Sequence, residues 1–380
     1  MDYAGDKKGR FISSANNKSF LVRMLKKIAG YDNYLMWGIK YVIPGIVERF
    51  IESGIVEQSG CSIIHRHDMY FALYLDEYFE KLGLYRLCTP HAPLSVAVSR
   101  GVGKRGKFRI DGSVYRDCLI HPGFLDIEKN FFAKTDALVL SSEHCLDGYS
   151  EFIDGFDNII SGKKLLKVYF GIPEPVASFK TARQCREKLN LPDNKLVVSF
   201  SGGYHLDKGF DIFLDMVSRT KKENILFACS GRGYINPPEY HNLVNFGWLD
   251  NQYDLIAASD VIVVANRYTF FDVIILESMA LGKPLVLTER GGNKEFRGMS
   301  EGIKVVKPDC DSISKAVDDI CHLSKQDREY LGAINRGLYE KHFTLERFAA
   351  AYKSAIASVL IPRREKEYQP GLNGVLKTER

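Results

Sequence analysis

The sequence predicts an α/β protein with two Rossmann-like, doubly wound domains that face each other across a cleft. Three observations lead to this fold class. A chain of 380 residues is too long for one ordinary core and suits two domains of moderate size. From residue 61 on, short apolar runs alternate with helical patterns, which favours parallel sheets. After residue 195 this rhythm starts again, so we expect a second sheet of the same kind.

The first sheet is predicted from apolar runs in the N-terminal half. Strands are expected within 61–67, 85–91, 130–143 and 165–172, with a helix over 70–83. The segment before them is less regular, but 18–30 places its apolar residues on one helical face and basic residues off it. We expect this helix to pack on its own domain, and contact with an anionic membrane is the alternative.

The second sheet is predicted from more distinct apolar runs. Its strands are expected within 196–203, 225–231, 243–248, 261–266, 284–289 and 303–306. The two halves meet at 171–180, where two prolines close to a glycine break the pattern. We therefore expect domains over 1–175 and 176–345, a helix over 346–360 that can return to the N-terminal domain, and a flexible tail over 361–380.

The stretch 267–296 contains a short helix with an unusual carboxylate. Apolar residues at 273–276 and beyond can cover one broad helical face, with Asp272 as a plausible N-cap and Gly282 as the C-terminal stop. Glu277 then sits in the middle of the helix among apolar neighbours. Because a carboxylate there is costly unless it is satisfied, Glu277 faces either solvent or a ligand.

Composition and charge exclude several classes of protein. A net charge of +5 is mild for this length and gives no reason to expect a nucleic-acid partner. The eight cysteines are scattered singly, without zinc-site spacing, so we expect buried thiols in a reducing compartment. Neither a signal peptide nor an apolar run of membrane-spanning length is evident. We expect a cytoplasmic location, with peripheral membrane association left open.

Several loops that follow the predicted strands of the second half contain glycines and basic residues. In open α/β sheets the ligand binds at the carboxyl ends of the strands. A Gly202-Gly203 turn lets a ligand approach the backbone, and Lys208 precedes a helix N-terminus, where anions are favoured. This pattern predicts a phosphate site, and a solvated surface lysine is the alternative. The stretch 290–296 repeats the pattern with another glycine pair and basic neighbours.

Taken together, "DKGFDIFL", "NFGWLD", "ESMALGKPLVLTERGGNKEF" and "HFTLERF" resemble the C-terminal domain of the GT-B glycosyltransferases of retaining family 4 (group 1). The resemblance runs from about residue 195 to 347 and implies a nucleotide-sugar site between two Rossmann-like domains. It implies that Lys208 neutralises the diphosphate and that Glu277 accepts hydrogen bonds from the ribose. Gly247 is implied to lie near the base, and the Gly202-Gly203 turn to belong to the same donor site.

The N-terminal half resembles the acceptor domain of this family over 62–68, 85–92, 136–149 and 168–175. His91 falls where a histidine of the family reaches the donor sugar, so the resemblance implies a catalytic role for it. The N-terminal domain is accordingly expected to bind the acceptor.

The sequence departs from the family pattern at three places. Thr269 stands where the family has its first glutamate, and the usual Phe-Gly after it is Phe271-Asp272. We expect the loop that contains Thr269, Phe270, Phe271 and Asp272 to contact the donor. Gly203 stands where the family has an arginine. The candidates for the second positive charge at the donor are Arg232, Arg267 and Lys294.

Three other patterns allow more than one interpretation. The basic loop at 101–109 fits a G-x-G-x-x-G expression but follows no strand, so its Lys104, Arg105, Lys107 and Arg109 are expected on the acceptor side or as an idle solvated loop. His65-x-His67-Asp68 could begin a metal site, but a structural or hydrogen-bonded histidine pair is favoured. For Asp309-Cys310-Asp311, which resembles a metal-diphosphate motif, helix capping is a sufficient role.

These patterns predict a retaining glycosyltransferase that moves a sugar from a nucleoside-diphosphate sugar, with a UDP-sugar as the expected donor. The acceptor is expected to be a hydroxyl of a glycan or a lipid-linked molecule in surface polysaccharide biosynthesis. In the family mechanism the leaving phosphate helps to deprotonate the acceptor, so we expect neither a metal nor a cofactor. One alternative is a non-catalytic partner subunit that binds nucleotide-sugars, and a metal-dependent hydrolase is a third hypothesis.

Overall fold

The computed structural model describes residues 39–95, 122–179 and 181–367 and contains two parallel sheets in two domains. The strands of the N-terminal sheet are β1 (Ile63–Arg66), β2 (Tyr85–Cys88), β3 (Ala137–Leu140) and β4 (Lys164–Lys167). Those of the C-terminal sheet are β5 (Leu196–Ser201), β6 (Ile225–Ser230), β7 (Leu243–Asn245), β8 (Val261–Val264), β9 (Leu285–Thr288) and β10 (Ile303–Val306). All the predicted strands are present, and the predicted α/β fold class is confirmed.

The C-terminal sheet has the order β10-β9-β8-β5-β6-β7, which reverses direction between β5 and β8. Because parallel sheets are covered on both faces, their strands are apolar throughout, and all four residues of β8 are buried. One face packs against α11 (Phe210–Arg219) and α14 (Cys310–Cys321). The opposite face packs against α10 (Ala182–Lys188), α12 (Tyr253–Ala258) and α13 (Val273–Ala280).

The N-terminal sheet has the order β1-β2-β3-β4, so its connections all run in one direction across the sheet. Helices formed by these connections then gather on one face. They are α5 (Met69–Lys81), α7 (Pro122–Ala133), α8 (Asp147–Phe152) and α9 (Phe156–Ile160), with α3 (Ile43–Glu52) and α4 (Ile55–Ser59) packed outside α5. Cys88, Leu138 and Leu140 point to this face and share one apolar cluster with the side chains of α7, α8 and α9.

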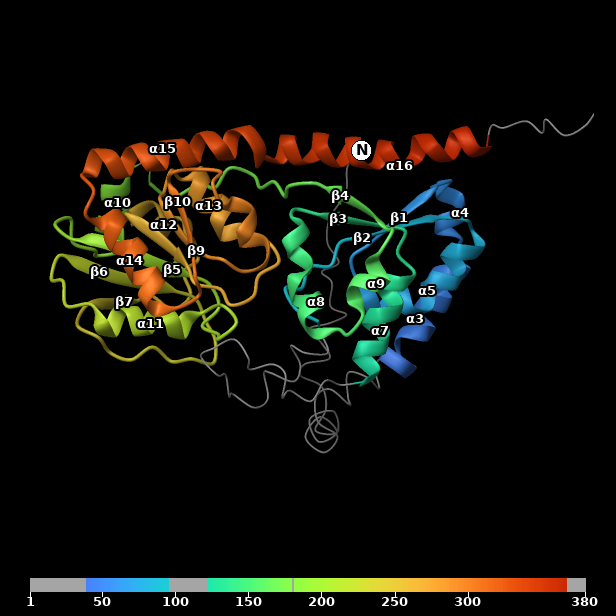
Figure 1. The fold of residues 1–380 in the computed structure, drawn as a ribbon, viewed down its shortest axis with the longest axis horizontal. Helices are drawn as coiled ribbons and strands as arrows, with labels where there is room; N and C mark the ends of the chain where they lie inside the picture. The colour runs from blue at the N-terminus through green and yellow to red at the C-terminus, as the bar shows by residue number, and fades with distance from the viewer. Residues whose placement is uncertain (1–38, 96–121, 180, 368–380) are drawn as a thin grey trace, which may run out of the picture.

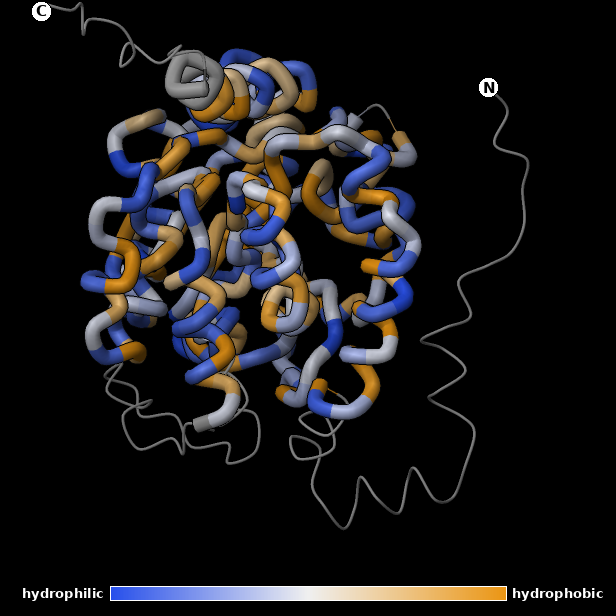
Figure 2. Tube along the Cα trace, turned by 90° about the vertical axis from the view of Figure 1, so that its right-hand side faces the viewer, coloured by the Kyte–Doolittle hydropathy of each residue, from blue (hydrophilic) through white to orange (hydrophobic). Residues whose placement is uncertain are grey.

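The last described helix covers the opposite face of the N-terminal sheet. Leu87, Val139 and Leu166 share an apolar cluster with Val359 of α16 (Leu345–Glu367). Figure 1 shows α15 (Lys325–His342) and α16 in line along one side of both domains. Figure 2 views the molecule from the N-terminal domain's end and shows hydrophobic and hydrophilic residues alternating along the elements. The helix continues to Glu367, beyond the end at 360 that the sequence indicated.

The two domains are joined by a continuous apolar cluster. It contains Phe132 and Tyr149 of the N-terminal domain together with Phe271, Met279 and other residues of the C-terminal domain. Two 3-10 helices also meet across this junction, η3 (Glu143–Leu146) and η4 (Gly291–Phe296). The loops at the carboxyl edge of the C-terminal sheet are therefore fixed partly by the N-terminal domain.

Most of the local sequence predictions are confirmed, but two of the described thiols are not buried: Cys61 is exposed and Cys321 is half-buried. The helix predicted in the stretch 267–296 is α13, and Gly282 follows it with a φ of 64°. Asp309 caps α14 by accepting a hydrogen bond from the Ser312 amide, as the capping interpretation required. The expectation of buried thiols is therefore wrong at Cys61 and Cys321, although the five other cysteines of the described chain are buried.

Candidate functional site

The candidate site lies where the C-terminal sheet reverses its strand order. The loops after β5 and β8 leave adjacent strands there, and the loop after β9 lies beside them. Gly209 allows the first two loops to touch, because a Cβ at this position would lie 1.8 Å from the carbonyl oxygen of Ala265. Gly292 allows the loop after β9 to touch the loop after β8, because a Cβ at Gly292 would lie 1.9 Å from the carbonyl oxygen of Phe270. The glycines thus bring three loops into one site.

Lys208 and Asp272 form an ion pair at the centre of these loops. The Lys208 Nζ lies 2.8 Å from Asp272 Oδ1. Burial alone would lower the pKa of Lys208, but the Asp272 carboxylate more than offsets it, and the pKa is raised. The ammonium group is therefore charged at neutral pH.

Asp272 occupies the N-cap position of α13, but its side chain makes no capping hydrogen bond. Besides pairing with Lys208, it accepts a hydrogen bond of 2.7 Å from Thr269 Oγ1 and another from Asn266 Nδ2. The prediction of a capping side chain is wrong at Asp272, because the carboxylate is directed to a cation 64 residues away in sequence.

Glu277 is satisfied by protein groups, which answers the question that its position in the helix raises. Its carboxylate accepts hydrogen bonds from Gln252 Nε2 at 3.0 Å and from the Tyr253 hydroxyl at 3.2 Å. The residue is 6% exposed, and burial raises the pKa of its carboxyl group. Glu277 thus faces neither bulk solvent nor the apolar core but two polar side chains of α12 and its preceding residue.

A cavity of about 430 Å³ opens beside these two polar side chains. Its lining comprises Gly202, Gly203, Ser230–Arg232 and Trp248–Tyr253, so it collects the loops after β5, β6 and β7. The Trp248 side chain is 63% exposed, and the Arg232 guanidinium lies 5.2 Å from its ring centroid. Gly247 precedes this tryptophan with a φ of 59°, and its carbonyl oxygen accepts a hydrogen bond from the Gly231 amide. An exposed aromatic ring beside a cavity is suited to stacking on a planar ligand.

Two other cations predicted for the site, Arg267 and Lys294, each form an ion pair with a carboxylate of the protein. Arg267 forms a bidentate ion pair with Asp211 at 2.6 and 2.7 Å, and its side chain is 11% exposed. Lys294 pairs at 2.6 Å with Asp147 of the N-terminal domain. Both positive charges are thus already compensated by protein carboxylates.

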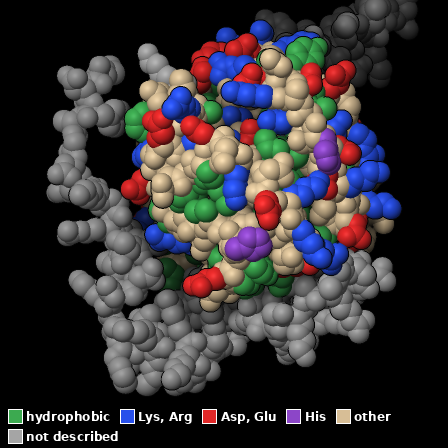
Figure 3. Space-filling view, turned by 90° about the vertical axis from the view of Figure 1, so that its left-hand side faces the viewer, with side chains coloured by type: hydrophobic (Ala, Val, Ile, Leu, Met, Phe, Trp, Pro, Cys, Tyr) green, Lys and Arg blue, Asp and Glu red, His purple; other side chains and the backbone are tan. Residues whose placement is uncertain are grey.

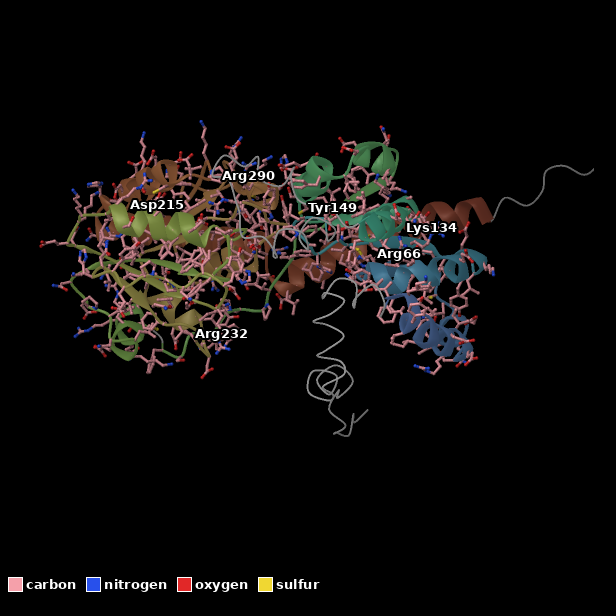
Figure 4. All side chains as sticks on the ribbon, turned by 90° about the horizontal axis from the view of Figure 1, so that it is seen from below. Arg66, Lys134, Tyr149, Asp215, Arg232 and Arg290 are labelled. Atoms are coloured by element: carbon pink, nitrogen blue, oxygen red, sulfur yellow. The ribbon has the colours of Figure 1, made fainter. Side chains whose placement is uncertain are left out.

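Two residues of the loop after β9 contain buried polar atoms without partners. Arg290 Nε and both polar side-chain atoms of Asn293 make no hydrogen bond within the described chain. Figure 4 shows Arg290 close to the N-terminal domain, Arg232 at the lower edge of the C-terminal domain, and Asp215 farther from the N-terminal domain. Buried polar atoms are usually satisfied, so these groups indicate room for a ligand or water. The sequence signal was the Arg-Gly-Gly-Asn run itself, but Arg290 and Asn293 were not among the predicted site residues.

Phe270 and Phe271 lie on the same loop but belong to the apolar junction. Phe271 is buried among aromatic rings that include Tyr169 and Phe343. Phe270 is 5% exposed, and its carbonyl oxygen accepts a hydrogen bond from the Cys145 thiol. These side chains position the loop, and a contact with a ligand is left to their backbone.

His91 reaches the same region from the N-terminal domain. Its ring centroid lies 6.4 Å from that of Phe270, and its Nε2 is 2.8 Å from His67 Nδ1. His65 bonds instead to Thr89 and to the Tyr352 hydroxyl of α16. Burial lowers the pKa values of His67 and His91, so we expect both to be mainly neutral at pH 7. The favoured interpretation of structural histidines is consistent with these bonds.

The metal alternative finds no support where the structure describes the chain. Asp68, which was its third potential ligand, caps α5 by accepting from the Tyr70 and Phe71 amides. Over the described ranges, no group of three or more His, Cys, Asp or Glu side chains could hold a metal ion.

The basic residues Lys104, Arg105, Lys107 and Arg109, and the amphipathic segment 18–30, lie outside the described residues. Among the helices that are described, none has the length and apolar character needed to cross a membrane.

Comparison with known proteins identifies the C-terminal domain. Residues 195–323 match the family model of the glycosyl transferases group 1. The chain is 23% identical over 233 residues to the O-antigen biosynthesis glycosyltransferase WclY of Escherichia coli, covering 58% of this chain and 60% of that protein. It is 28% identical over 184 residues to the lipopolysaccharide core biosynthesis glycosyltransferase LpsE of Rhizobium meliloti, covering 46% and 53%. The chain thus spans about 60% or less of the length of these curated relatives.

Solved structures show the same two-domain architecture. The sucrose-phosphate synthase of Thermosynechococcus elongatus gives a TM-score of 0.62 at 17% identity, covering 86% of this chain and 78% of that chain. Anabaena Alr3699/HepE in complex with UDP also gives 0.62, at 13% identity, with coverage of 83% and 82%. The resemblance to group 1 glycosyltransferases with the GT-B fold is confirmed.

Proposed function

We propose that this chain, whose C-terminal domain matches the group 1 glycosyl transferases, moves a sugar from a nucleoside-diphosphate sugar to a hydroxyl of a glycan or lipid-linked acceptor. The single observation that carries the proposal is the charged Lys208 at the switch point of a doubly wound sheet, in the loop after β5, whose Gly202 and Gly203 line the cavity. We take the donor to be a UDP-sugar and the reaction to be a retaining one, as in family 4. The names of the WclY and LpsE relatives support a role in surface polysaccharide biosynthesis.

Lys208 would stabilise the diphosphate as it leaves the sugar. Its ammonium is fixed by the loop after β5, next to the N-terminus of α11, where a phosphate is favoured by the helix dipole. Asp272 would compete with the phosphate for this cation in the unliganded protein, since it lies at 2.8 Å. Donor binding then requires that Lys208 turns from Asp272 towards the phosphate, or that Asp272 binds a hydroxyl of the sugar at the same time.

The nucleoside would occupy the cavity lined by Trp248. The indole ring is exposed and can stack on the base, and the neighbouring Gly247 leaves the backbone open to it. Glu277 would accept hydrogen bonds from the ribose hydroxyls. Because Tyr253 and Gln252 hold this carboxylate in the unliganded protein, at least one of them would have to share it or move away.

Arg290 is our candidate for the second positive charge. Arg267 and Lys294 are each paired with a carboxylate, whereas Arg290 has a buried Nε without a partner, as do the polar atoms of Asn293 beside it. A cation that is not already neutralised adds more stabilisation to a leaving diphosphate. Arg232, which lines the cavity and lies over Trp248, would contact the donor closer to the base.

His91 would contact the donor sugar from the opposite domain. The ring lies beside the loop that contains Phe270, and its hydrogen bond to His67 fixes its orientation. The acceptor hydroxyl would lose its proton to an oxygen of the leaving phosphate, so the proposal requires no metal and no nucleophilic side chain. Thr269 would then contribute through Asp272, to which it donates a hydrogen bond.

The non-catalytic alternative is favoured by one observation, the Lys208–Asp272 pair itself. A carboxylate at 2.8 Å neutralises the cation that catalysis would use, at a position where the family has glycine. The experiment measures UDP binding by calorimetry and UDP release from UDP-sugars in the presence of EDTA, for the wild type, Asp272→Asn and Thr269→Val. The proposal predicts UDP release by the wild type and lower turnover in Asp272→Asn.

A wild type that binds UDP but releases none from any UDP-sugar with acceptor lipids or glycans supports the binding subunit instead. Full activity of both variants would reject the contact of this loop with the donor. Activity that EDTA abolishes and manganese restores would contradict a metal-independent reaction.

A further inference from the structure

A second cavity lies at the opposite, amino-terminal edge of the C-terminal sheet. Its volume is about 470 Å³, and its walls include the residues just before β5, β8 and β9 together with the first turn of α15. Six basic side chains line it: Arg183, Arg186, Lys195, Lys283, Lys325 and Arg328. Three carboxylates line it as well: Asp193, Asp260 and Glu329. The cavity therefore has a marked excess of positive charge.

The carboxylates cannot compensate these cations one for one. Asp260 is shared by Arg186 at 2.6 Å and Arg328 at 3.7 Å. Lys195 and Lys283 have no carboxylate within ion-pair distance among the described residues. By contrast, Figure 3 shows basic and acidic side chains interleaved over the exposed end of this domain. The unbalanced charge distinguishes the cavity from an ordinary solvated surface.

Two of the basic residues are partly buried, Arg328 and Lys283. The Arg328 side chain is 11% exposed, and its Nε is buried without a hydrogen-bond partner. The Lys283 Nζ donates to the carbonyl oxygen of Ala257 at 2.7 Å, and burial lowers the pKa of this amine to about 8. Lys283 has no carboxylate at ion-pair distance among the described residues, and Arg328 shares Asp260 with Arg186. An additional anion in the cavity would compensate this excess of positive charge.

We propose that this cavity is a binding site for a small phosphorylated molecule, separate from the donor site. Arg328 of α15 lines it with a buried Nε that has no partner, whereas the guanidinium of Arg186 of α10 already donates to Asp260 and to backbone carbonyl oxygens. Arginine binds phosphate oxygens through its N–H donors. Lys283 and Lys195 supply point charges from a third side, which suits a group with more than one negative charge. The volume leaves space for an organic part beyond the phosphate itself.

The site lies at the far end of α13 from the donor site. Lys283 follows the C-terminus of that helix, whereas Asp272 precedes its N-terminus. α15, which begins with Lys325 and contains Arg328, also packs along α13. Binding at one end of the helix can therefore be measured separately from binding at the other, and the inference does not depend on the donor assignment.

The test is calorimetric titration of the full chain with inorganic phosphate, in a buffer without other multivalent anions. We expect saturable binding that Arg328→Gln weakens by about tenfold, the equivalent of ~1.4 kcal/mol, with or without Lys208 in place. Lys195→Gln, which removes a partly exposed and unpaired charge, serves as a second variant if Arg328→Gln fails to fold. It should weaken phosphate binding by a smaller factor.

Two matched controls separate this site from charge in general and from the donor site. Lys304→Gln combined with Lys315→Gln removes charge from another basic cavity of the same domain and should leave phosphate affinity unchanged. Lys208→Ala should also leave it unchanged. The proposal is wrong if phosphate binding is not saturable, or if the Lys304→Gln and Lys315→Gln control loses as much phosphate affinity as Arg328→Gln. It is also wrong if Lys208→Ala loses phosphate affinity and Arg328→Gln does not.

Discussion

The two domains cover their sheets by different means. The C-terminal sheet reverses its strand order, so its own connecting helices cover both faces. In the described part of the N-terminal domain the connections run in one direction, and the second face is covered by α16 from the opposite end of the chain. The C-terminal sheet is therefore covered by its own segment of chain, whereas the N-terminal sheet, whose last strand ends at Lys167, depends on a helix that begins at Leu345.

The largest effect is expected where this dependence is broken. Val359→Asp places a carboxylate in the apolar cluster between α16 and the N-terminal sheet, where the valine is 5% exposed. We expect a loss of roughly 3 kcal/mol or more in the free energy of unfolding, because the charge is buried without a partner. Thermal unfolding followed by circular dichroism measures it. Ser354→Asp, on the exposed side of α16, is the control and should change stability by less than ~0.5 kcal/mol.

If both variants melt like the wild type, the N-terminal sheet does not need α16, and the contrast between the domains is wrong. If Val359→Asp unfolds the N-terminal domain and the variant still binds UDP, the C-terminal domain folds without it.

A smaller effect is expected on turnover from the C-terminal site. Lys208→Ala removes a charge whose interaction strengthens as negative charge grows on the leaving diphosphate, so kcat should fall by about 100-fold, or ~3 kcal/mol, with a smaller change in donor KM. Lys222→Ala is the matched control, because Lys222 also pairs with an aspartate in this domain, at 2.8 Å from Asp318. Steady-state kinetics on the folded variants measure kcat and the donor KM. Equal kinetic constants for the two variants would remove Lys208 from the mechanism.

The smallest effect concerns the pH dependence of stability. Burial raises the pKa of Glu277 in the folded state, so its contribution to stability is present below the ordinary glutamate pKa of about 4.3 and is lost as pH rises through the folded value. Glu277→Gln lacks this loss, and its stability relative to the wild type should improve from pH 4 to pH 7. Melting temperatures across this range give the measurement.

Glu174 provides a control of opposite sign. Its hydrogen bond with Arg336 lowers the pKa of its carboxyl group, so its stabilising contribution is present at neutral pH and is lost on acidification. The stability of Glu174→Gln relative to the wild type should therefore decrease as pH rises. If the stability of both variants relative to the wild type changes in the same direction with pH, the environments assigned to Glu277 and Glu174 are wrong.

Local patterns predicted the strands well. Strands such as β8 are buried on both faces and read as continuous apolar runs. Lys208 lies in the loop after β5, and Glu277 lies within α13. What the sequence could not supply were partners from distant segments. Asp272 was expected to cap α13, but its side chain bonds to Lys208, and that pairing depends on the order of strands in the sheet.

The residues that were missed depend on the contact between domains. The Nε of Arg290 and the whole of Asn293 are buried at the loop where η4 packs against η3, a contact that no local period encodes. The same contact pairs Lys294 with Asp147. Likewise, the end of α16 at Glu367 lies beyond the predicted one. Site residues are thus predictable where one element presents them and less so where two domains enclose them.

The central claim is that the carboxyl edge of the C-terminal sheet binds a nucleoside diphosphate with Glu277 at the ribose. The most direct test is a calorimetric titration of UDP into the wild type and Glu277→Ala, with Arg328→Gln as a control at the far end of the domain. We predict saturable UDP binding by the wild type, a dissociation constant about tenfold higher for Glu277→Ala, or ~1.4 kcal/mol, and an unchanged value for the control. Equal UDP affinity in a folded Glu277→Ala variant and the wild type would contradict the account.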